Sequence, residues 1–266
     1  NGTSPVVVIA IIIVIIVAAV GVSSYFLLKG GEGFTHNPIY IDGNEKFTAV
    51  NGVVAGSGTL GDPYIIEKWD ISAESENGIE IRNTTAHFII RNCHIHSRKS
   101  NSGIYLYIVK NGRIENNIVK SNDSGIYLYN SSNNSLKNNI CSSNLELGIL
   151  LENSSNNTLS NETCENNILG IQLVNSENNI LYNNTCSNNY GYGIWFVDSD
   201  NNIFDNNTCM NDHYGIHLYY SDKNILSSNT CKNNNYGIYL ETSKNNIVYN
   251  NNVKNNDYGF SPVSYT

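Results

Sequence analysis

Short apolar segments recur along the chain at a nearly constant spacing. The motif Gly-Ile-x-Leu, in which x is a variable residue, appears as Gly103-Ile104-Tyr105-Leu106 and again as Gly125-Ile126-Tyr127-Leu128. The equivalent glycines lie at 78, 103, 125, 148, 170, 193, 215, 237 and 259, so successive intervals are 22 to 25 residues. A period this constant over about 180 residues indicates a repeat architecture.

Each repeat contains two further apolar segments. Ile180-Leu181 and Thr185-Cys186 are one such pair, and Asn, Ser, Asp and Gly separate the segments. These separating residues tolerate left-handed backbone and hydrogen-bond to their own main chain, so they mark turns. Three short strands cannot bury an apolar face alone, so neighbouring repeats have to stack. The absence of helical periodicity disfavours a leucine-rich repeat.

The pattern predicts a parallel β-helix in which each repeat is one coil and neighbouring coils lie about 4.8 Å apart. The interior should contain two columns of stacked residues, which are Ile104, Ile126, Ile149, Ile171, Ile194, Ile216 and Ile238, and Leu106, Leu128, Leu151, Leu173, Phe196, Leu218 and Leu240. Asparagine supplies 48 of the 266 residues, and in stacked coils its side chains can bond up and down a ladder at the turns.

The chain divides into four regions. Residues 1–28 form a predicted hydrophobic helix, because residues 6–28 carry no charge, Ser4 is a good N-cap and Pro5 suits the first helical position. Such a helix is long enough to cross a bilayer. A glycine-rich hinge at 29–35 and an irregular N-terminal cap at 36–72 precede the β-helix repeats at 73–266.

The stretch Gly2-Thr3-Ser4-Pro5-Val6-Val7 resembles the mature start of archaeal type IV pilins and archaellins. In those families a short leader is removed and the exposed helices bundle into a filament core. The resemblance implies polymerisation through the helix, for which we expect contacts from Pro5, Val8, Ile12, Ile15, Val20 and Phe26. A single membrane-spanning tether is the alternative.

The repeat region resembles the NosD-like group of right-handed parallel β-helix proteins, described as carbohydrate-binding and sugar-hydrolase domains. The resemblance covers residues 38–260 and rests on Gly56-Ser57-Gly58-Thr59, Asp62-Pro63-Tyr64-Ile65-Ile66, Asn77-Gly78-Ile79-Glu80-Ile81 and Asn116-Asn117-Ile118. The expected fold is therefore all-β, a right-handed parallel β-helix of about nine coils preceded by one long hydrophobic α-helix.

Aromatic residues recur at two positions beside the repeat glycine. They are Tyr105, Tyr127, Trp195, His217 and Tyr239 two residues after it, and Tyr192, Tyr214 and Tyr236 just before it. An aromatic stripe along a rod can stack on sugars or form a subunit contact. We favour the subunit contact, with glycan binding and cross-strand stacking as alternatives.

Charge and residue types argue against several functions. The net charge of −8 gives no basic footprint for nucleic acid. A glycosidase needs two carboxylates across a cleft, and no arginine follows Arg113, which weighs against a lyase with an arginine base. We therefore expect no catalytic residues, no cofactor and no enzyme activity.

Cysteines and histidines offer weak metal signals. Cys141, Cys164, Cys186, Cys209 and Cys231 share one register of successive coils, which favours a buried sulfur column over a metal site, with one or two disulfides as an alternative. His94 and His96 lie on one face of a strand, but two imidazoles without a third ligand make a weak site, so structural roles are favoured.

Stacked acids and glycosylation motifs complete the candidates. Glu177, Asp200 and Asp222 occupy one position of three coils and are weak Ca²⁺ candidates, although solvated turn residues are the favoured interpretation. Asparagine-x-Ser/Thr motifs predict N-glycosylation at Asn83, Asn122, Asn130, Asn133, Asn153, Asn156, Asn161, Asn183 and Asn206.

The favoured function is a structural subunit of an extracellular, type IV pilus-like surface filament that displays the β-helix outward, with adhesion as one role. Its expected partners are other copies of itself, surface glycans, and the membrane before assembly. The alternative is a membrane-tethered extracellular carbohydrate-binding protein, and a sugar-active enzyme is favoured less.

Overall fold

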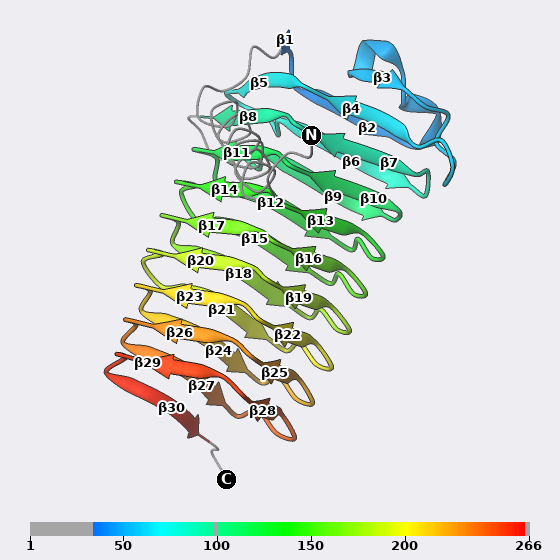
Figure 1. The fold of residues 1–266 in the computed structure, drawn as a ribbon. Helices are drawn as coiled ribbons and strands as arrows, with labels where there is room; N and C mark the ends of the chain where they lie inside the picture. Colours follow the sequence, from blue (N-terminus) through cyan, green and yellow to red (C-terminus); the bar gives the residue numbers. More distant parts are fainter. Residues whose placement is uncertain (1–33, 98–100, 264–266) are drawn as a thin grey trace, which may run out of the picture. The chain divides into compact units, whose positions relative to one another are not determined.

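The structure is a computed structural model that describes residues 34–97 and 101–263. From Thr35 onward the chain forms one compact unit, a parallel β-helix in which every coil gives one strand to each of three sheets. Figure 1 shows the coils stacked in sequence order. The predicted helix at 1–28 lies outside the described residues, and within the described ranges no helix is long and apolar enough to cross a membrane.

Each sheet has ten strands, and β4 and all later strands pair with one another in parallel. Sheet A contains, in spatial order, β1 (Phe34–His36), β5 (Trp69–Ala73), β8 (His94–Ser97), β11 (Ile118–Lys120), β14 (Ile140–Ser142), β17 (Thr163–Glu165), β20 (Thr185–Ser187), β23 (Thr208–Met210), β26 (Thr230–Lys232) and β29 (Asn252–Lys254).

Sheet B has the longest strands. It contains β2 (Ile39–Asp42), β6 (Ile79–Thr84), β9 (Ile104–Val109), β12 (Ser124–Tyr129), β15 (Leu147–Glu152), β18 (Leu169–Val174), β21 (Tyr192–Val197), β24 (Tyr214–Tyr219), β27 (Tyr236–Glu241) and β30 (Tyr258–Val263).

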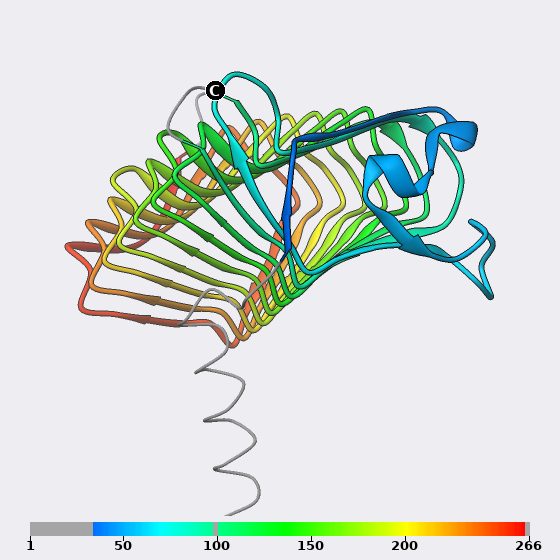
Figure 2. The ribbon, with the colours of Figure 1, turned by 90° about the horizontal axis from the view of Figure 1, so that it is seen from above.

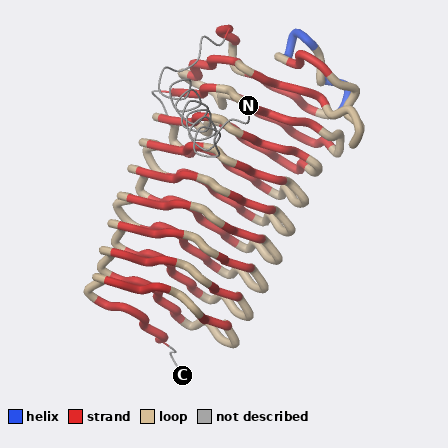
Figure 3. Tube along the Cα trace, viewed as in Figure 1, coloured by secondary structure: helices blue, strands red, loops and turns tan. Residues whose placement is uncertain are grey.

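Sheet C completes each coil. It contains β3 (Val53–Ala55), β4 (Tyr64–Glu67), β7 (Phe88–Arg91), β10 (Gly112–Glu115), β13 (Ser135–Lys137), β16 (Thr158–Ser160), β19 (Ile180–Tyr182), β22 (Ile203–Asp205), β25 (Ile225–Ser227) and β28 (Ile247–Tyr249). In Figure 3 the strands occupy the flat sides of each coil and the loops its corners.

The N-terminal end departs from the repeat in fewer residues than expected. The segment predicted as a cap, 36–72, already supplies regular strands to all three sheets. Only the 3₁₀ turns η1 (Asn44–Lys46) and η2 (Ala49–Asn51) and the antiparallel strand β3 are additional. Because β3 pairs with β4 at the end of sheet C, it covers a strand edge that would otherwise be open. Figure 2 shows the 3₁₀ turns at this end of the stack.

The two predicted interior columns are confirmed. Ile104, Ile126 and Ile149 are aligned on adjacent strands of sheet B, and the same alignment continues to Ile238. The leucine column, with Phe196 in place of one leucine, runs beside it and is also buried. Alternate residues of each strand therefore fill one continuous core, as the two-residue period of a strand requires.

The repeat glycines are required by close approach of the backbone. A Cβ atom added to Gly148 would lie 2.5 Å from the carbonyl oxygen of Gly170 and 3.0 Å from Cβ of Cys164. The neighbouring repeat glycines meet the same obstacle, namely the glycine carbonyl of the next coil. The glycine period is thus a consequence of coil stacking.

Asparagine has two distinct roles at the corners. Asn178 is exposed with a φ of 57°, in the left-handed region that asparagine tolerates better than most residues. The next residue, Asn179, is buried, and its Oδ1 accepts the backbone N–H of Asn157 one coil earlier at 2.8 Å. The N–H of Asn179 in turn donates to Oδ1 of Asn202 at 2.7 Å. The predicted side-chain ladder is confirmed, and it satisfies backbone groups that the sheets leave unpaired.

One ladder contains a carboxyl group in place of an amide. Oδ1 of Asp212 accepts both N–H and Nδ2–H of Asn189, while its Oδ2 has no hydrogen-bond partner among the described residues. At the equivalent position, Asn234 donates from Nδ2 to the carbonyl of Cys209 at 3.2 Å. Burial raises the pKa of Asp212 to about 8, so its neutral form is favoured near neutral pH.

The cysteine column is confirmed as buried sulfur. Cys141, Cys164, Cys186, Cys209 and Cys231 are aligned across sheet A. All six cysteines lie within the described residues, and all are buried and free of disulfides. Burial raises the pKa of Cys164 and Cys209, which keeps these thiols protonated and unreactive.

Replacing Gly148 by alanine should destabilise the stack. The added methyl group would meet a backbone carbonyl that cannot move without shifting a coil, so we expect the free energy of unfolding to fall by about 1–3 kcal/mol. Denaturant unfolding followed by circular dichroism measures this. Gly61→Ala is the matched control, since no atom lies within 4 Å of its added Cβ. Equal stability of the two variants would contradict the stacking argument.

Asp212→Asn should stabilise the protein increasingly as pH rises. The raised pKa means that folding retains a proton that the unfolded chain releases, so wild-type stability is full below the ordinary aspartate pKa and is lost as pH rises toward 8. The variant lacks this loss. Its advantage should grow by up to about 1.4 kcal/mol per pH unit in that window, measured by denaturant unfolding at several pH values. The exposed Asp198→Asn is the control, and a pH-independent advantage would refute the argument.

Candidate functional site

The predicted aromatic stripe lies on the outer face of sheet B, where its residues occupy two registers, one two residues after the repeat glycine and one just before it. It forms two groups, because Leu150 of β15 and Gln172 of β18 separate Tyr127 from Trp195. The first group lies on β9 and β12 and also includes Tyr107 and Tyr129. The second spans β21, β24 and β27.

The second group consists of rings stacked on one another. The ring centroids of Tyr192 and Tyr214 are 4.8 Å apart and those of Tyr214 and Tyr236 are 4.6 Å apart, with interplanar angles of 11° in both pairs. Trp195 stacks on Tyr192 at 4.6 Å. Tyr214 therefore has a ring against each face, and cross-strand stacking accounts for much of this group.

His217 does not belong to an exposed contact surface. Its side chain lies on the outer face but is covered by the rings of Tyr192, Tyr214 and Tyr239, which leaves it 5% exposed. Its Nε2 lies 3.4 Å from Oε2 of Glu241, yet neither ring nitrogen makes a well-directed hydrogen bond to any described residue. Burial lowers the pKa of His217 to about 4, so the neutral ring packs as an aromatic.

A pocket lies over the first aromatic group. Its volume is ≈ 320 Å³, and it is lined by Asn77, Asn101, Ser102, Tyr105, Asp123, Ser124, Tyr127, Glu146, Leu147 and Leu150. Tyr105 and Tyr127 are half-buried and tilted by 47°, at a centroid distance of 5.1 Å. The hydroxyl of Tyr127 donates to Oε2 of Glu152. Apolar ring surface, amides, hydroxyls and carboxylates thus converge on one concavity.

Burial and neighbouring charges determine the protonation of the tyrosines in this pocket. Burial raises the pKa of Tyr105, and burial together with the Glu152 hydrogen bond raises that of Tyr127, so both phenols stay protonated. The guanidinium carbon of Arg82 lies 5.6 Å from the ring centroid of Tyr105, and Arg82 pairs with Glu80. Asp123 and Glu146 come from the corner loops before β12 and β15. Two carboxylates beside a sugar-sized cavity can serve as acid and base.

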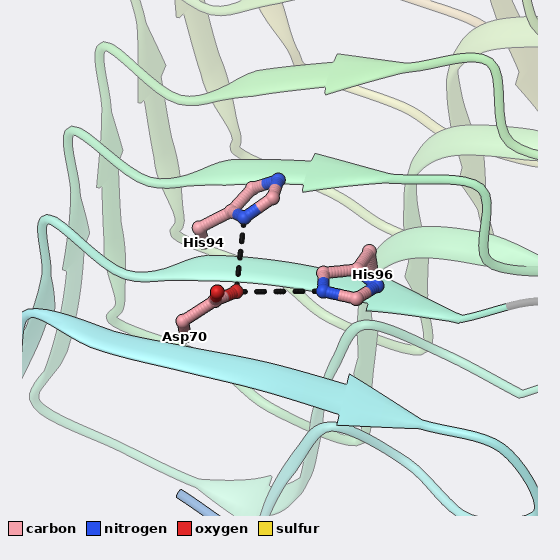
Figure 4. Close-up of side chains that lie close together, drawn as sticks. All are labelled: Asp70, His94 and His96. Atoms are coloured by element: carbon pink, nitrogen blue, oxygen red, sulfur yellow. Dashed lines mark hydrogen bonds and ion pairs between the residues drawn. The ribbon is translucent and has the colours of Figure 1, made fainter. Parts of the chain in front are cut away.

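A second cluster lies on the outer face of sheet A (Figure 4). Asp70 of β5 is in register with His94 of β8, and His96 lies two residues further along β8 on the same face. Oδ1 of Asp70 is 3.0 Å from Nδ1 of His94 and 3.4 Å from Nε2 of His96. Burial, followed by the charge of Lys120, lowers the pKa of His94. Among the described residues, this is the group of three side chains placed to share a metal ion.

The predicted calcium column has other contacts. Glu177 is exposed, Oδ1 of Asp200 accepts the backbone N–H of Asp222 at 2.7 Å, and Oδ1 of Asp222 accepts that of Lys244 at 2.6 Å. These bonds tie successive turns together, as expected for turn residues. Calcium binding here stays a prediction.

The predicted glycosylation sites separate into two classes. Asn122 is fully buried in a ladder, where its Nδ2 donates to the carbonyl of Lys120, so the folded chain does not present it and that prediction is corrected. The other asparagines are exposed and have a positive φ: Asn83, Asn130, Asn133, Asn153, Asn156, Asn161, Asn183 and Asn206. Glycosylation at these corners stays a prediction.

Sequence reasoning missed the residues that complete both sites. Asp70 was assigned to the cap, although it precedes His94 by 24 residues and so lies one repeat earlier in the same register. Extending the repeat backward would have found it. Asp123 and Glu146 lie in corners where hydrophobic periodicity carries no information, so the sequence alone does not reveal the pocket.

Comparison with known proteins identifies the family to which this fold belongs. A family model described as a right handed beta helix region matches residues 27–177 and 123–253. A search of curated proteins found no match.

Among solved structures, the periplasmic alginate epimerase AlgG matches with a TM-score of 0.60 at 18% identity, over 75% of this chain and 59% of that one. The A-module of the mannuronan C-5 epimerase AlgE4 of Azotobacter vinelandii gives 0.55 at 15% identity, over 75% and 63%. The Dettilon tailspike protein gives 0.59 at 15% identity, over 93% and 65%.

These matches show a shared fold, and the chain spans less than two thirds of the length of each of these three structures. They also overturn the prediction that the chain is not an enzyme, because solved structures with this fold include epimerases. The absence of an arginine base was therefore too narrow a criterion. The predicted filament role depends on residues 6–28, which lie outside the described residues, and the comparisons lend it no support.

Proposed function

The chain belongs to the family of proteins with a right handed beta helix region, and from that premise we propose that it is a carbohydrate-active protein that binds a sugar chain on the outer face of sheet B. The pocket over Tyr105 and Tyr127 is the observation that carries this proposal. Its volume of ≈ 320 Å³ lies at the lower end of the range for small-molecule sites, which suits one or two sugar units of a longer chain.

The composition of the pocket wall supports sugar recognition. Tyr105 and Tyr127 are tilted against each other, so they are less closely covered by neighbouring rings than Tyr214 and can pack against the apolar face of a sugar. Asn101, Ser102 and Ser124 offer donors and acceptors for sugar hydroxyls. An extended chain can continue along the outer positions of neighbouring coils, because these repeat in register.

Charge indicates the class of sugar. Asp123 and Glu146 line the pocket, Glu152 is bonded to Tyr127, and the nearby cation Arg82 already pairs with Glu80. The whole chain carries a net charge of −8. A polyanionic sugar would be repelled, so we propose a neutral or amino sugar polymer, which distinguishes this pocket from one that takes a uronate.

Asp123 and Glu146 are the residues we assign to catalysis. The two residues occupy the same position on adjacent coils, where the backbone N–H of Glu146 donates to the carbonyl of Asp123 at 2.9 Å. Carboxylic acids beside a bound sugar can protonate a leaving group or abstract a proton. A location outside the cytoplasm agrees with the eight exposed Asn-x-Ser/Thr corners and with the fold's occurrence in AlgG, a periplasmic epimerase. This function does not require the filament helix.

Truncating the pocket aromatics should weaken sugar binding. We expect Tyr127→Ala and Tyr105→Ala each to reduce affinity for a neutral polysaccharide about 10-fold, since the apolar contact surface is lost. Affinity electrophoresis across neutral, amino and uronate polysaccharides measures this. Tyr182→Ala on sheet C is the matched control. Binding that is unaffected by both pocket variants, or strongest for uronates, would contradict the proposal.

Removing the carboxylates should separate binding from turnover. Asp123→Asn and Glu146→Gln keep the size of the side chains, so we expect binding to a neutral polymer to persist while product formation falls about 100-fold or more. Chromatography of polymer digests reports the products. Glu165→Gln on sheet A should behave as wild type. Turnover that survives both pocket substitutions would remove them from the chemistry and leave binding alone.

A further inference from the structure

We propose that Asp70, His94 and His96 form a binding site for a divalent transition-metal ion such as Zn²⁺. The three side chains project from β5 and β8 on the outer face of sheet A, toward one another (Figure 4). The site lies on a different sheet from the sugar pocket and does not depend on the proposed carbohydrate function.

The distances between the donor atoms suit one shared ion. Ligands held about 2.0–2.1 Å from Zn²⁺ in a tetrahedral arrangement lie about 3.3 Å from one another. Oδ1 of Asp70 lies 3.0 Å from Nδ1 of His94 and 3.4 Å from Nε2 of His96, and all three donor atoms fall within 4.8 Å of one another. An ion can therefore bind with small rotations of side chains and no movement of the sheet.

The donor set selects the class of metal. Two imidazoles and one carboxylate suit Zn²⁺ and neighbouring first-row metals, whereas Ca²⁺ and Mg²⁺ prefer sites built from oxygen ligands alone. The backbone of two hydrogen-bonded strands fixes the register of Asp70 against His94, so the strands hold these two ligands together before the ion arrives. His96 is in register with Lys120 of β11 and Ser72 of β5, whereas Asp70 is in register with His94.

Room for a further ligand exists beside the cluster. Asp70 and His96 help to line a cavity of ≈ 690 Å³ with Ser72 and with residues of the N-terminal segment, which are Thr35, His36, Asn37, Pro38 and Val50. Three protein ligands with an accessible fourth position are typical of zinc sites that bind water or a substrate group. His36 also lines this cavity, but its Nδ1 contacts the carbonyl of Asn37 and its ring packs on Trp69, so the fourth position is left to water or a substrate group.

The competing interpretation is an ion pair between Asp70 and the two histidines without metal. An exposed or half-exposed pair of that kind contributes little to stability. The two interpretations differ in a measurable way, because only a metal site binds an ion with defined stoichiometry.

The test uses the full chain after treatment with EDTA, titrated with Co²⁺ and with Zn²⁺. We expect one equivalent of Co²⁺ to produce the visible absorption band of four- or five-coordinate cobalt, and one equivalent of Zn²⁺ to abolish it. Asp70→Ala, His94→Ala and His96→Ala should each weaken binding about 10-fold or more and lose the band. Zn²⁺ should also raise the melting temperature of the wild type, since it binds the folded state.

His213→Ala is the matched control. His213 is exposed, its Nδ1 contacts Asn235 of the next coil, and both residues lie several coils away from the histidine cluster. It should bind as the wild type does. Circular dichroism of each variant establishes that the solenoid is intact, so that loss of the band reports the site. The proposal is overturned if the wild type binds no stoichiometric metal, if the three variants bind as it does, or if Ca²⁺ binds as tightly as Zn²⁺.

Discussion

The spacing of stacked coils is the constraint on which the whole structure depends. Because the backbone N–H and C=O groups of the inner strands bond to the coils on either side, no side chain can hold the coils apart where their backbones approach. Glycine is needed where the carbonyl of Gly170 approaches Gly148, and a short amide side chain is needed where the N–H of Asn157 has no sheet partner. The unusual composition of the chain follows from these two requirements.

The same constraint explains why the fold could be predicted well from the sequence. In a stacked solenoid, each structural position recurs once in every coil. The repeat glycines, the Ile104 and Leu106 columns and the aligned cysteines are such recurring positions. Local pattern and global fold agree at these positions, so the prediction was strong. It failed at the N-terminal end, where Asp70 lies in a regular strand within a segment that lacks the repeat consensus.

The sites were less predictable for a physical reason. Outward side chains are chosen by what they bind and not by the coil spacing, so their pattern does not reveal which rings cover one another. The sequence predicts Tyr214 and His217 on the outer face, but only the three-dimensional structure shows that neighbouring rings occupy the faces of Tyr214 and bury His217. Tyr105 and Tyr127, which share the register of His217, instead border a cavity.

The replacement of an amide by a carboxyl group at Asp212 has a consequence for the rest of the rod. Each coil of a solenoid contacts only its two neighbours. A weakened interface between two coils therefore divides the stack into two blocks, and the contact between the blocks is less stable than the contacts within each block. In alkaline solution, ionisation of this buried acid would concentrate opening of the rod between β20 and β26. The coils that carry the tyrosine pocket and the histidine cluster belong to the block before Asp212.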